Sequence, residues 1–385
     1  MSTIGKRIYA ELKGDRVIWM ILAVLALFSI LAVYSATGSL AYKMRGGNTE
    51  AYLIRHGFIL MLGLIVAYLA YSVNYMRYKF IAPWLLLISV PLLIYTLGFG
   101  EEINNARRWI EVPFIGLTFQ TSDFARMALI LFVAREITRH NDYIKDFNKA
   151  FVPIILPILL VCGLIAPSDL STSIMLFFTT VLMMFIGRVD LKYIVLLLIL
   201  GVIVFAALVG IGRMFPDFVR VETWSSRIKE FITDPDGGYQ VMHSKIAIAS
   251  GEWIGKGPGN SAMRNYLPAP YSDFIYAIIC EEYGLVGGFF IMAMFILLLI
   301  RTTVLVTKST KQFGAMMALG LCLSMVVQAL ANMAVSVNLV PVTGLTLPVV
   351  SMGGTSVLFS CLSIGIILSV SRYVEQVAAQ TGEEE

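Results

Sequence analysis

The sequence predicts an all-α integral membrane protein with about ten transmembrane helices and a large structured extracellular loop between helices 7 and 8. Three observations predict this fold class. Hydrophobic residues make up 58% of the 385 positions and charged residues only 14%, whereas soluble domains average about 45–50% and about 25%. The apolar residues gather in blocks of roughly 20, the length of helix that crosses a hydrocarbon core. A long polar interval, 213–273, interrupts these blocks once.

Ten apolar segments are candidates for membrane-spanning helices. The fourth is short and carries charge, so composition supports it least. The first is followed by a polar loop rather than a small-residue cleavage site, which favours a retained helix over a cleaved signal peptide. The segments are 17–37, 56–73, 80–99, 122–137, 150–166, 172–187, 192–212, 274–301, 313–337 and 354–374.

Lysine and arginine residues are distributed unequally between the two sides of these segments. With a cytoplasmic N-terminus, 16 of them lie in cytoplasmic segments and 5 in the short outer loops, namely Lys43, Arg45, Arg55, Arg107 and Arg108. Because positively charged loops tend to stay in the cytoplasm, we expect both termini to be cytoplasmic. The long loop then lies on the outer face.

The chain is predicted to form a single polytopic membrane domain, 1–385, whose extracytoplasmic loop 213–273 bears the active site. A connection of this length between two helices is usually functional. Within it, the apolar residues Val241, Ile246, Ile248 and Ala249 lie among polar ones over 239–253, which predicts a helix lying at the interface. The glycines and the proline of 255–259 end that helix.

Asp273 lies between a proline-rich stretch and the eighth apolar segment. Two interpretations are open and do not exclude each other. The carboxylate could cap the helix that follows, as aspartate often does. It could also act as a general base at the outer face, since desolvation there would raise its pKa towards the working range.

Two further groups of charged residues lie inside the apolar segments. Glu281 and Glu282 follow Asp273 on the same helix, but neither is expected to share its face, and they are either functional carboxylates or paired structural groups. Asp123 and Arg126 are spaced i, i+3 and are predicted to form a structural ion pair.

The long loop is rich in cationic residues, which suits either a diphosphate or lipid headgroup or ordinary solvation. We expect substrate contacts from loop residues, with Lys245 and Arg264 foremost, and from the uncharged segment 340–356. Irregular backbone of the kind that Pro and Gly impose on 340–356 must be buried in protein or line a cavity. The predicted substrate-binding residues are Lys245, Arg264, Arg220, His243, Gln240 and Ser351.

No metal site can be recognised in the sequence. The three histidines are scattered, and the four cysteines lie within apolar segments without metal-ligand spacing, as expected of small packing residues. The glycine-rich stretch 255–259 is not a phosphate-binding P-loop, because its Gly-Lys is followed by Gly. Metal ligands therefore stay unknown, and nucleic acid is not an expected partner.

Several segments together resemble the SEDS family (shape, elongation, division and sporulation) of membrane peptidoglycan glycosyltransferases, which includes FtsW and RodA. The resemblance covers nearly the whole chain and is closer to division-type FtsW. In 120–126, Asp123 and Arg126 replace the Glu and Lys of the family, so the charge signs are kept. The segments that carry it are 107–110, 120–126, 167–170, 239–259, 267–274, 281–284 and 341–356.

The resemblance implies that the protein polymerises lipid II into glycan strands at the outer face of the bacterial cytoplasmic (inner) membrane, with Asp273 as catalytic base. It implies an inverting glycosyltransferase, used in cell division or in the maintenance of cell shape. Basic loop residues, and a divalent cation such as Mg²⁺ if one is bound, would offset the charge of the leaving diphosphate.

The expected partners are lipid II, the nascent glycan strand, a class B penicillin-binding protein with a single-pass anchor and transpeptidase activity, and other divisome membrane proteins. The alternative is a lipid II flippase, or a non-catalytic scaffold that recruits lipid II and a transpeptidase. A flippase should need charged groups through the depth of the membrane, whereas here the charged constellation lies at the outer face. That distribution favours the enzyme.

Overall fold

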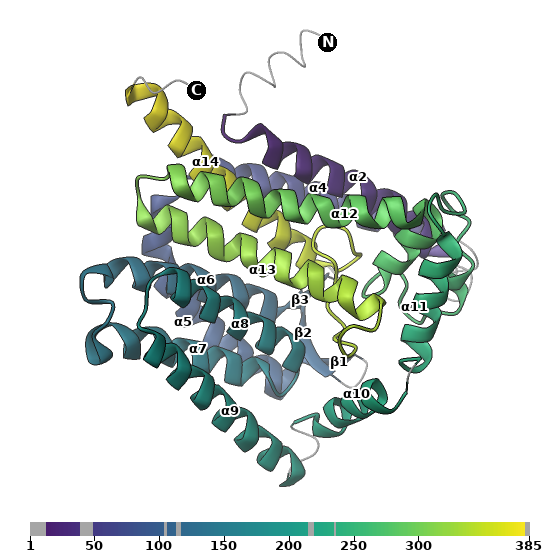
Figure 1. The fold of residues 1–385 in the computed structure, drawn as a ribbon, viewed down its shortest axis with the longest axis horizontal. Helices are drawn as coiled ribbons and strands as arrows, with labels where there is room; N and C mark the ends of the chain where they lie inside the picture. The colour runs from purple at the N-terminus through teal and green to yellow at the C-terminus, as the bar shows by residue number, and fades with distance from the viewer. Residues whose placement is uncertain are drawn as a thin grey trace.

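The computed structural model describes residues 13–38, 49–103, 106–112, 117–214, 219–234 and 236–381, and the chain is almost entirely helical in these ranges (Figure 1). Of the residues that entered the charge count, Lys6, Arg7, Lys43 and Arg45 lie outside them. Ten helices correspond to the ten expected spans. They are α2 (Arg16–Ala36), α4 (Thr49–Ser72), α5 (Met76–Phe99), α6 (Thr121–Arg139), α7 (Val152–Ile165), α8 (Leu170–Ile186), α9 (Leu191–Met214), α12 (Ile275–Lys308), α13 (Gln312–Ser336) and α14 (Thr355–Thr381).

Eight of the described helices are long and apolar enough to cross a membrane, and a π-helical turn, Phe147–Phe151, extends α7 to that length. Helix α8 is apolar but shorter. Helix α6 is long enough, but charged side chains such as Asp123, Arg126 and Glu136 lower its hydropathy. Those charges are mostly turned into the protein, because Asp123 and Glu136 are each less than 5% exposed.

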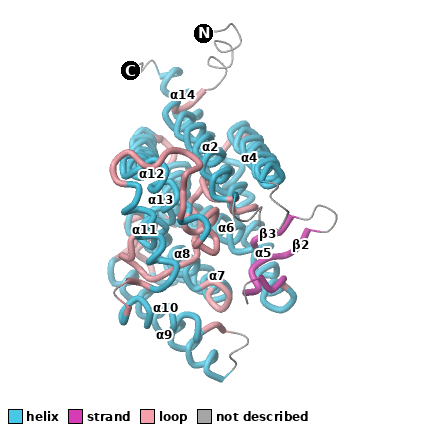
Figure 2. Tube along the Cα trace, turned by 90° about the vertical axis from the view of Figure 1, so that its right-hand side faces the viewer, coloured by secondary structure: helices cyan, strands magenta, loops and turns pink. Residues whose placement is uncertain are grey.

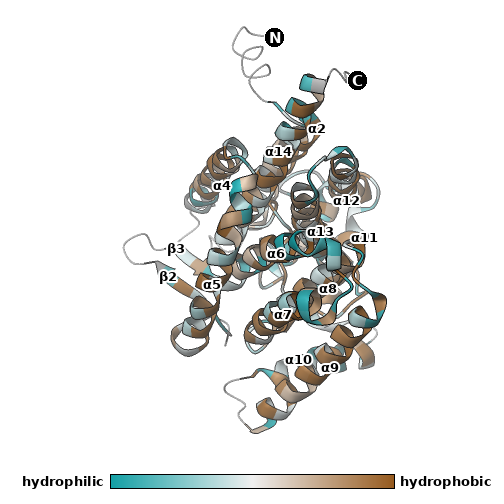
Figure 3. Cartoon of the chain, turned by 90° about the vertical axis from the view of Figure 1, so that its left-hand side faces the viewer, coloured by the Kyte–Doolittle hydropathy of each residue, from teal (hydrophilic) through white to brown (hydrophobic). Residues whose placement is uncertain are grey.

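The helices differ widely in how much of their surface the protein covers. Helices α13 and α14 are 78% and 67% buried over their most apolar windows, whereas α9 is 11% buried. Figure 3 shows α9 at the edge of the bundle with an almost uniformly hydrophobic surface. Helix α13 therefore belongs to the core of the bundle, and α9 presents its surface to lipid.

A small antiparallel sheet joins α5 to α6, where the sequence predicted only a short loop. Strands β1 (Glu101–Ile103), β2 (Ala106–Val112) and β3 (Leu117–Gln120) pair in the order β1-β2-β3, and Figure 2 shows the sheet beside α5. Runs rich in β-branched and aromatic residues favour strands. These runs are too short to be distinguished from a loop by periodicity alone.

The long loop holds helix α10 (Val221–Thr233), helix α11 (Gly238–Gly251) and a 3₁₀ turn (Met263–Asn265). Helix α11 matches the helix expected over 239–253, and in Figure 1 it runs across the direction of α12 and α13. Just beyond it, Lys256 N–H donates to the Glu281 carbonyl at 3.0 Å, and Leu285 N–H donates to the Glu252 carbonyl at 2.8 Å. Gly284, with a φ of +70°, provides the kink in α12 that makes this pairing possible.

The described ends of the chain meet on one side of the bundle. The Asp15 N–H donates to Ser371 Oγ at 2.7 Å, and the Gly14 N–H donates to the Glu375 carboxylate. Asp15 also forms an ion pair with Arg301 at 2.8 Å. An even number of spans requires the two ends to share a side. Which side faces the cytoplasm stays a prediction from the charge count.

Candidate functional site

Asp273 lies in the turn that precedes α12. The cap position of α12 falls on Phe274, and no side chain caps the helix, so the carboxylate of Asp273 is not occupied as a helix cap. Its own backbone N–H and Ser272 are polar neighbours that act to lower its pKa. Among the described residues, no lysine or arginine nitrogen lies within 4 Å of it. The carboxylate therefore keeps acceptor capacity for a substrate hydroxyl.

The backbone around Asp273 is held by α13 and by the segment between α13 and α14. The Asn332 side-chain amide donates to the carbonyls of Asp273 and Leu345, at 2.7 Å each. The Ser351 hydroxyl donates to the Ser272 carbonyl at 2.6 Å, and the Met352 N–H donates to the Tyr271 carbonyl at 2.9 Å. Thus the uncharged segment expected to line a cavity is fastened directly to the turn that carries Asp273.

Gly344, within that segment, lies beside the carboxylate. A methyl group added at Gly344 would lie 3.9 Å from Oδ2 of Asp273, and the φ of Gly344 is +71°. Only glycine adopts this conformation without strain. The backbone of 344 can therefore approach the carboxylate without covering it.

Two arginines set the electrostatics of the turn. Burial raises the pKa of the Asp273 carboxyl, while its hydrogen bonds and the charges of Arg227 and Arg108 act in the opposite direction. Arg227, on α10, donates to the Val342 carbonyl at 3.1 Å. Burial and the nearby Arg108 lower the pKa of the Arg227 guanidinium. Because arginine stays charged in proteins, two cations flank a carboxylate that they do not neutralise by direct contact.

Arg108 is held in place by two residues that directly precede α8. It forms an ion pair with Asp169 at 3.2 Å and donates through Nε to the Ser168 carbonyl at 2.8 Å. Asp169 also accepts from the Thr172 N–H at 3.1 Å, which caps α8. The arginine on the sheet is therefore fixed by the start of a membrane helix.

The Asp123–Arg126 ion pair is present at the start of α6, with a nitrogen–oxygen distance of 3.3 Å and both side chains largely buried. Arg126 also donates to the side chain of Gln328 on α13. Gln328 in turn donates to the Thr346 carbonyl at 2.8 Å. Hydrogen bonds through Gln328 thus connect the ion pair to the segment that faces Asp273.

Glu281 and Glu282 are enclosed in a separate group of contacts. Glu281 pairs with Lys256 at 2.8 Å and accepts from the N–H groups of Ala262 and Met263 at 3.1 and 3.2 Å. Glu282 accepts from Ser35 and from the Ser261 N–H. These contacts fit the structural interpretation, because both carboxylates fasten the loop to α12.

The predicted substrate-binding residues fall into two regions. Ser351 lies next to the Asp273 turn, and Arg220 directly precedes α10. On α11, Gln240 is half-buried, Lys245 pairs with Asp236 at 3.3 Å, and His243 packs between Tyr239 and Tyr266. Arg264 donates to Ser35 at 3.2 Å and lies near Glu282. The contacts of these α11 and 3₁₀ residues include Asp236, Tyr239, Tyr266 and Ser35.

Sequence reasoning did not select Arg227, Arg108 or Asn332 as site residues. Arg227 was one of many cations in the loop, and Arg108 lies 165 residues before Asp273. Asn332 is an uncharged polar residue within an apolar segment, and a buried amide of this kind needs partners. That requirement is the one sequence feature by which Asn332 could have been selected.

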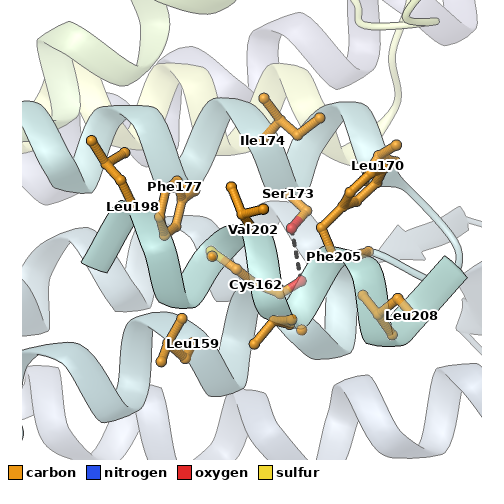
Figure 4. A pocket seen from close by; sticks show the side chains of 14 residues that line it. Leu159, Cys162, Leu170, Ser173, Ile174, Phe177, Leu198, Val202, Phe205 and Leu208 are labelled. Atoms are coloured by element: carbon orange, nitrogen blue, oxygen red, sulfur yellow. Dashed lines mark hydrogen bonds between the residues drawn. The ribbon is translucent and has the colours of Figure 1, made fainter. Parts of the chain in front are cut away.

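An apolar pocket of about 310 Å³ lies between α7, α8 and α9. Figure 4 shows Leu159, Phe177, Val202 and Phe205 around it, with the Ser173 hydroxyl donating to the Cys162 carbonyl at 2.7 Å. Leu170, at one end of the pocket, follows Asp169 in sequence. The pocket therefore extends to the residue that follows Asp169, and its lining is almost entirely apolar.

Within the described ranges, no group of three or more His, Cys, Asp or Glu side chains is gathered closely enough to hold a metal ion. All four cysteines are buried and unpaired. The residues around Asp273 thus do not fit a cation held by the protein alone.

The sequence matches the profile of a family of cell cycle proteins, FtsW, RodA and SpoVE, over residues 15–376. It is 31% identical over 369 residues to the probable peptidoglycan glycosyltransferase FtsW of Aromatoleum aromaticum, which covers 93% of this chain and 88% of that protein. It is also 31% identical over 384 residues to the protein of the same name from Trichlorobacter lovleyi, covering 96% of each.

Solved structures share the fold. One is a chain from a peptidoglycan synthase complex that coordinates polymerization and crosslinking, with a TM-score of 0.71 and 23% identity over 94% of this chain and 98% of that chain. Another is the rod shape determining protein RodA of Thermus thermophilus, with a TM-score of 0.67 and 22% identity over 94% and 98% of the two chains. Both confirm the polytopic helical fold.

Proposed function

The chain belongs to the family of cell cycle proteins that includes FtsW, RodA and SpoVE, and from this premise we propose that it is a division-type peptidoglycan glycosyltransferase with Asp273 as its base. The substrate is lipid II, which adds to a growing glycan strand. The observation that carries the proposal is an incompletely satisfied carboxylate, at the head of a membrane helix, flanked by two arginines.

The reaction is a single displacement. The acceptor sugar hydroxyl forms a bond to the anomeric carbon of the donor strand, and the bond from that carbon to the diphosphate oxygen breaks. The electron pair leaves with the diphosphate, and the hydroxyl proton moves to Asp273. A carboxyl whose pKa is raised by burial is a stronger proton acceptor than an exposed one, which suits this role.

Arg227 and Arg108 are placed to receive the diphosphate. Their guanidinium groups are positively charged and lie near Asp273, and guanidinium groups bind phosphate oxygens in pairs. Because Asp169 and the Val342 carbonyl already hold them, little reorganisation is needed as charge develops on the leaving group.

The apolar pocket between α7, α8 and α9 suits the isoprenoid chain of the lipid-linked substrate. Its lining is almost entirely apolar and includes Leu170, the residue after Asp169. A chain that ended at Leu170 would leave its diphosphate on the side of the pocket where Asp169 pairs with Arg108. Lys245, Arg264, Arg220, His243, Gln240 and Ser351 remain candidates for contacts with the sugars and peptide. A divalent cation such as Mg²⁺ would then be held by the diphosphate rather than by a protein ligand set.

The proposed setting is the bacterial cytoplasmic membrane, with both termini inside and the loop 213–273 as the catalytic extracytoplasmic part of one membrane domain. A structural neighbour comes from a complex that coordinates polymerization and crosslinking. This supports a crosslinking partner, and we propose a class B penicillin-binding protein. Other divisome membrane proteins would bring the pair to the division site.

The alternative function, a lipid II flippase or a scaffold, predicts a different response to one substitution. Asp273→Asn keeps the shape of the side chain but removes the proton acceptor. We expect lipid II polymerisation by purified protein to fall by about 10²–10⁴-fold, while lipid II binding and thermal stability persist. The matched control is Glu222→Gln, an exposed carboxylate on α10 of the same loop. Near-normal polymerisation by well-folded Asp273→Asn protein would favour the flippase or scaffold.

A further inference from the structure

A buried histidine on α4 is connected through α2 to the segment that faces Asp273. His56 Nε2 lies 2.7 Å from Ser29 Oγ, and the Ser29 hydroxyl donates to the Val350 carbonyl at 2.9 Å. His56 and Ser29 are fully buried, and so is Val350. Ionisable side chains within membrane helices are rare and usually functional, and neither His56 nor Ser29 is used in the reaction described above.

The hydrogen-bond geometry determines where the protons lie. Ser29 has one hydroxyl hydrogen, which the Val350 carbonyl accepts. The second contact of the Ser29 oxygen must therefore be a donor, so His56 carries its proton on Nε2. Nδ1 of His56 has no partner among the described residues. A second proton there would leave a buried charged donor unsatisfied, so the ring is neutral.

The Val350 carbonyl belongs to a strained turn. Val349 has a φ of +66°, a conformation in which a β-branched residue is a true outlier. Such residues persist only where their surroundings hold them. The contact from Ser29 immediately follows the strained residue, so it is placed to hold the turn in this shape.

Ser351, the next residue, connects the turn to Asp273. Its hydroxyl accepts from the Leu347 N–H at 2.8 Å and donates to the Ser272 carbonyl at 2.6 Å. A rotation of the 350 peptide would move this hydroxyl and with it the backbone beside Asp273. The polar chain therefore runs from α4, through α2 and the turn, to the residue that precedes the proposed base.

We propose that His56 and Ser29 are positioning residues, which hold the 349–351 turn and thereby set the reach of Asp273 towards the acceptor hydroxyl. This inference rests on the proposed function, because it assigns a role in the same reaction. Neither side chain touches substrate. Their effect is on the geometry of the proton transfer, where a misplacement of about 1 Å can lower the rate by about 10²-fold.

The test is the kinetics of lipid II polymerisation by purified variants. Ser29→Ala and His56→Leu each remove one contact of the chain, and we expect kcat to fall by roughly 10- to 100-fold with KM little changed. His56→Gln keeps an N–H donor and should recover much of the rate. The double variant should be no slower than the worse single one, because both changes break the same chain.

Ser89→Ala is the matched control. Ser89 is also a fully buried serine in a membrane helix, but its hydroxyl donates to Leu86 of its own helix at 2.7 Å. It should lose little stability and no kcat. Thermal unfolding of each variant separates loss of folded protein from loss of turnover.

Two outcomes would overturn the inference. One is a kcat for folded Ser29→Ala and His56→Leu equal to that of Ser89→Ala. The other is a change confined to KM. Wild-type protein and Asp273→Asn in the same assay separate this failure from that of the proposed function. If wild type polymerises, Asp273→Asn does not and the positioning variants match the control, only the positioning role falls.

Discussion

Helix α12 is preceded by one acidic side chain and carries two more in its first turns, and their surroundings differ sharply. The Glu281 carboxylate has no exposed surface and accepts hydrogen bonds from a lysine, a serine hydroxyl and two backbone N–H groups. The Asp273 carboxylate has no ion pair within 4 Å among the described residues, and only the charges of two nearby arginines and the polar groups of Ser272 and its own backbone lower its pKa. One carboxylate is satisfied by the protein, and the other retains unused acceptor capacity.

This difference separates a structural carboxylate from a reactive one. A buried ion pair with additional hydrogen bonds holds two segments together, and breaking it is destabilising. A carboxylate that the fold leaves partly unsatisfied has capacity for a substrate proton. Substitutions in the Asp273 group should therefore change turnover, and substitutions in the Glu281 group should change stability.

Among the substitutions of residues that surround these two carboxylates, Arg227→Gln should have the largest effect. This change removes a charge beside Asp273 and the proposed diphosphate site, and loss of one such stabilising group typically lowers kcat by about 10²–10³-fold. Polymerisation kinetics and thermal unfolding measure the two effects separately. Lys229→Gln, an exposed charge on the same helix, is the control. Loss of stability without loss of kcat would place Arg227 with the structural group.

Glu281→Gln should show the opposite pattern. The amide replaces one carboxylate oxygen with a donor that faces other donors, namely Lys256 and backbone N–H groups. We expect the free energy of unfolding to fall by about 1–3 kcal/mol, while turnover per folded molecule stays the same. Thermal unfolding in detergent micelles measures this, with the exposed Glu252→Gln as control. A large loss of kcat with normal stability would contradict the structural assignment.

The pH dependence of kcat provides a finer comparison. The base works as a carboxylate, so activity is lost as pH falls through its pKa. Burial has the largest effect on the pKa of Asp273 and raises it, although the charge of Arg227 acts in the opposite direction. The acidic limb of the kcat profile should therefore lie at higher pH than that of an ordinary aspartate. In Arg227→Gln it should move to still higher pH. A limb that stays in place or moves to lower pH in this variant would argue against Asp273 as the titrating group.

Lys256→Met should have the smallest effect. The Lys256 side chain is 35% exposed, and Glu281 keeps its serine and backbone donors when the lysine is lost. Partly exposed ion pairs contribute about 0.2–1 kcal/mol, so the unfolding temperature should fall less than in Glu281→Gln. If it falls further, the lysine, rather than the backbone donors, is what satisfies Glu281.

Much of the site could not be predicted, because its parts come from distant segments. Arg108 and Asp169 are 61 residues apart, and both are distant from Asp273 in sequence. The long loop contains many lysine and arginine residues that were equally plausible as site residues, and no periodicity distinguishes Arg227 from Lys229. Lys245 and Arg264 were favoured by their position along the chain, and their contacts include Asp236 and Ser35, respectively.

The sequence by itself determined the ten helical spans, helix α11 of the long loop and the choice of Asp273 as a candidate site residue. These depend on local properties, because apolar length, helix periodicity and proline breaks can be recognised within one segment. The tertiary structure decided which side chains meet. It brought Arg227, Arg108 and the 340–356 segment to Asp273 and enclosed Glu281 in the loop, because hydrogen bonds and charge pairs depend on distances that only packing establishes.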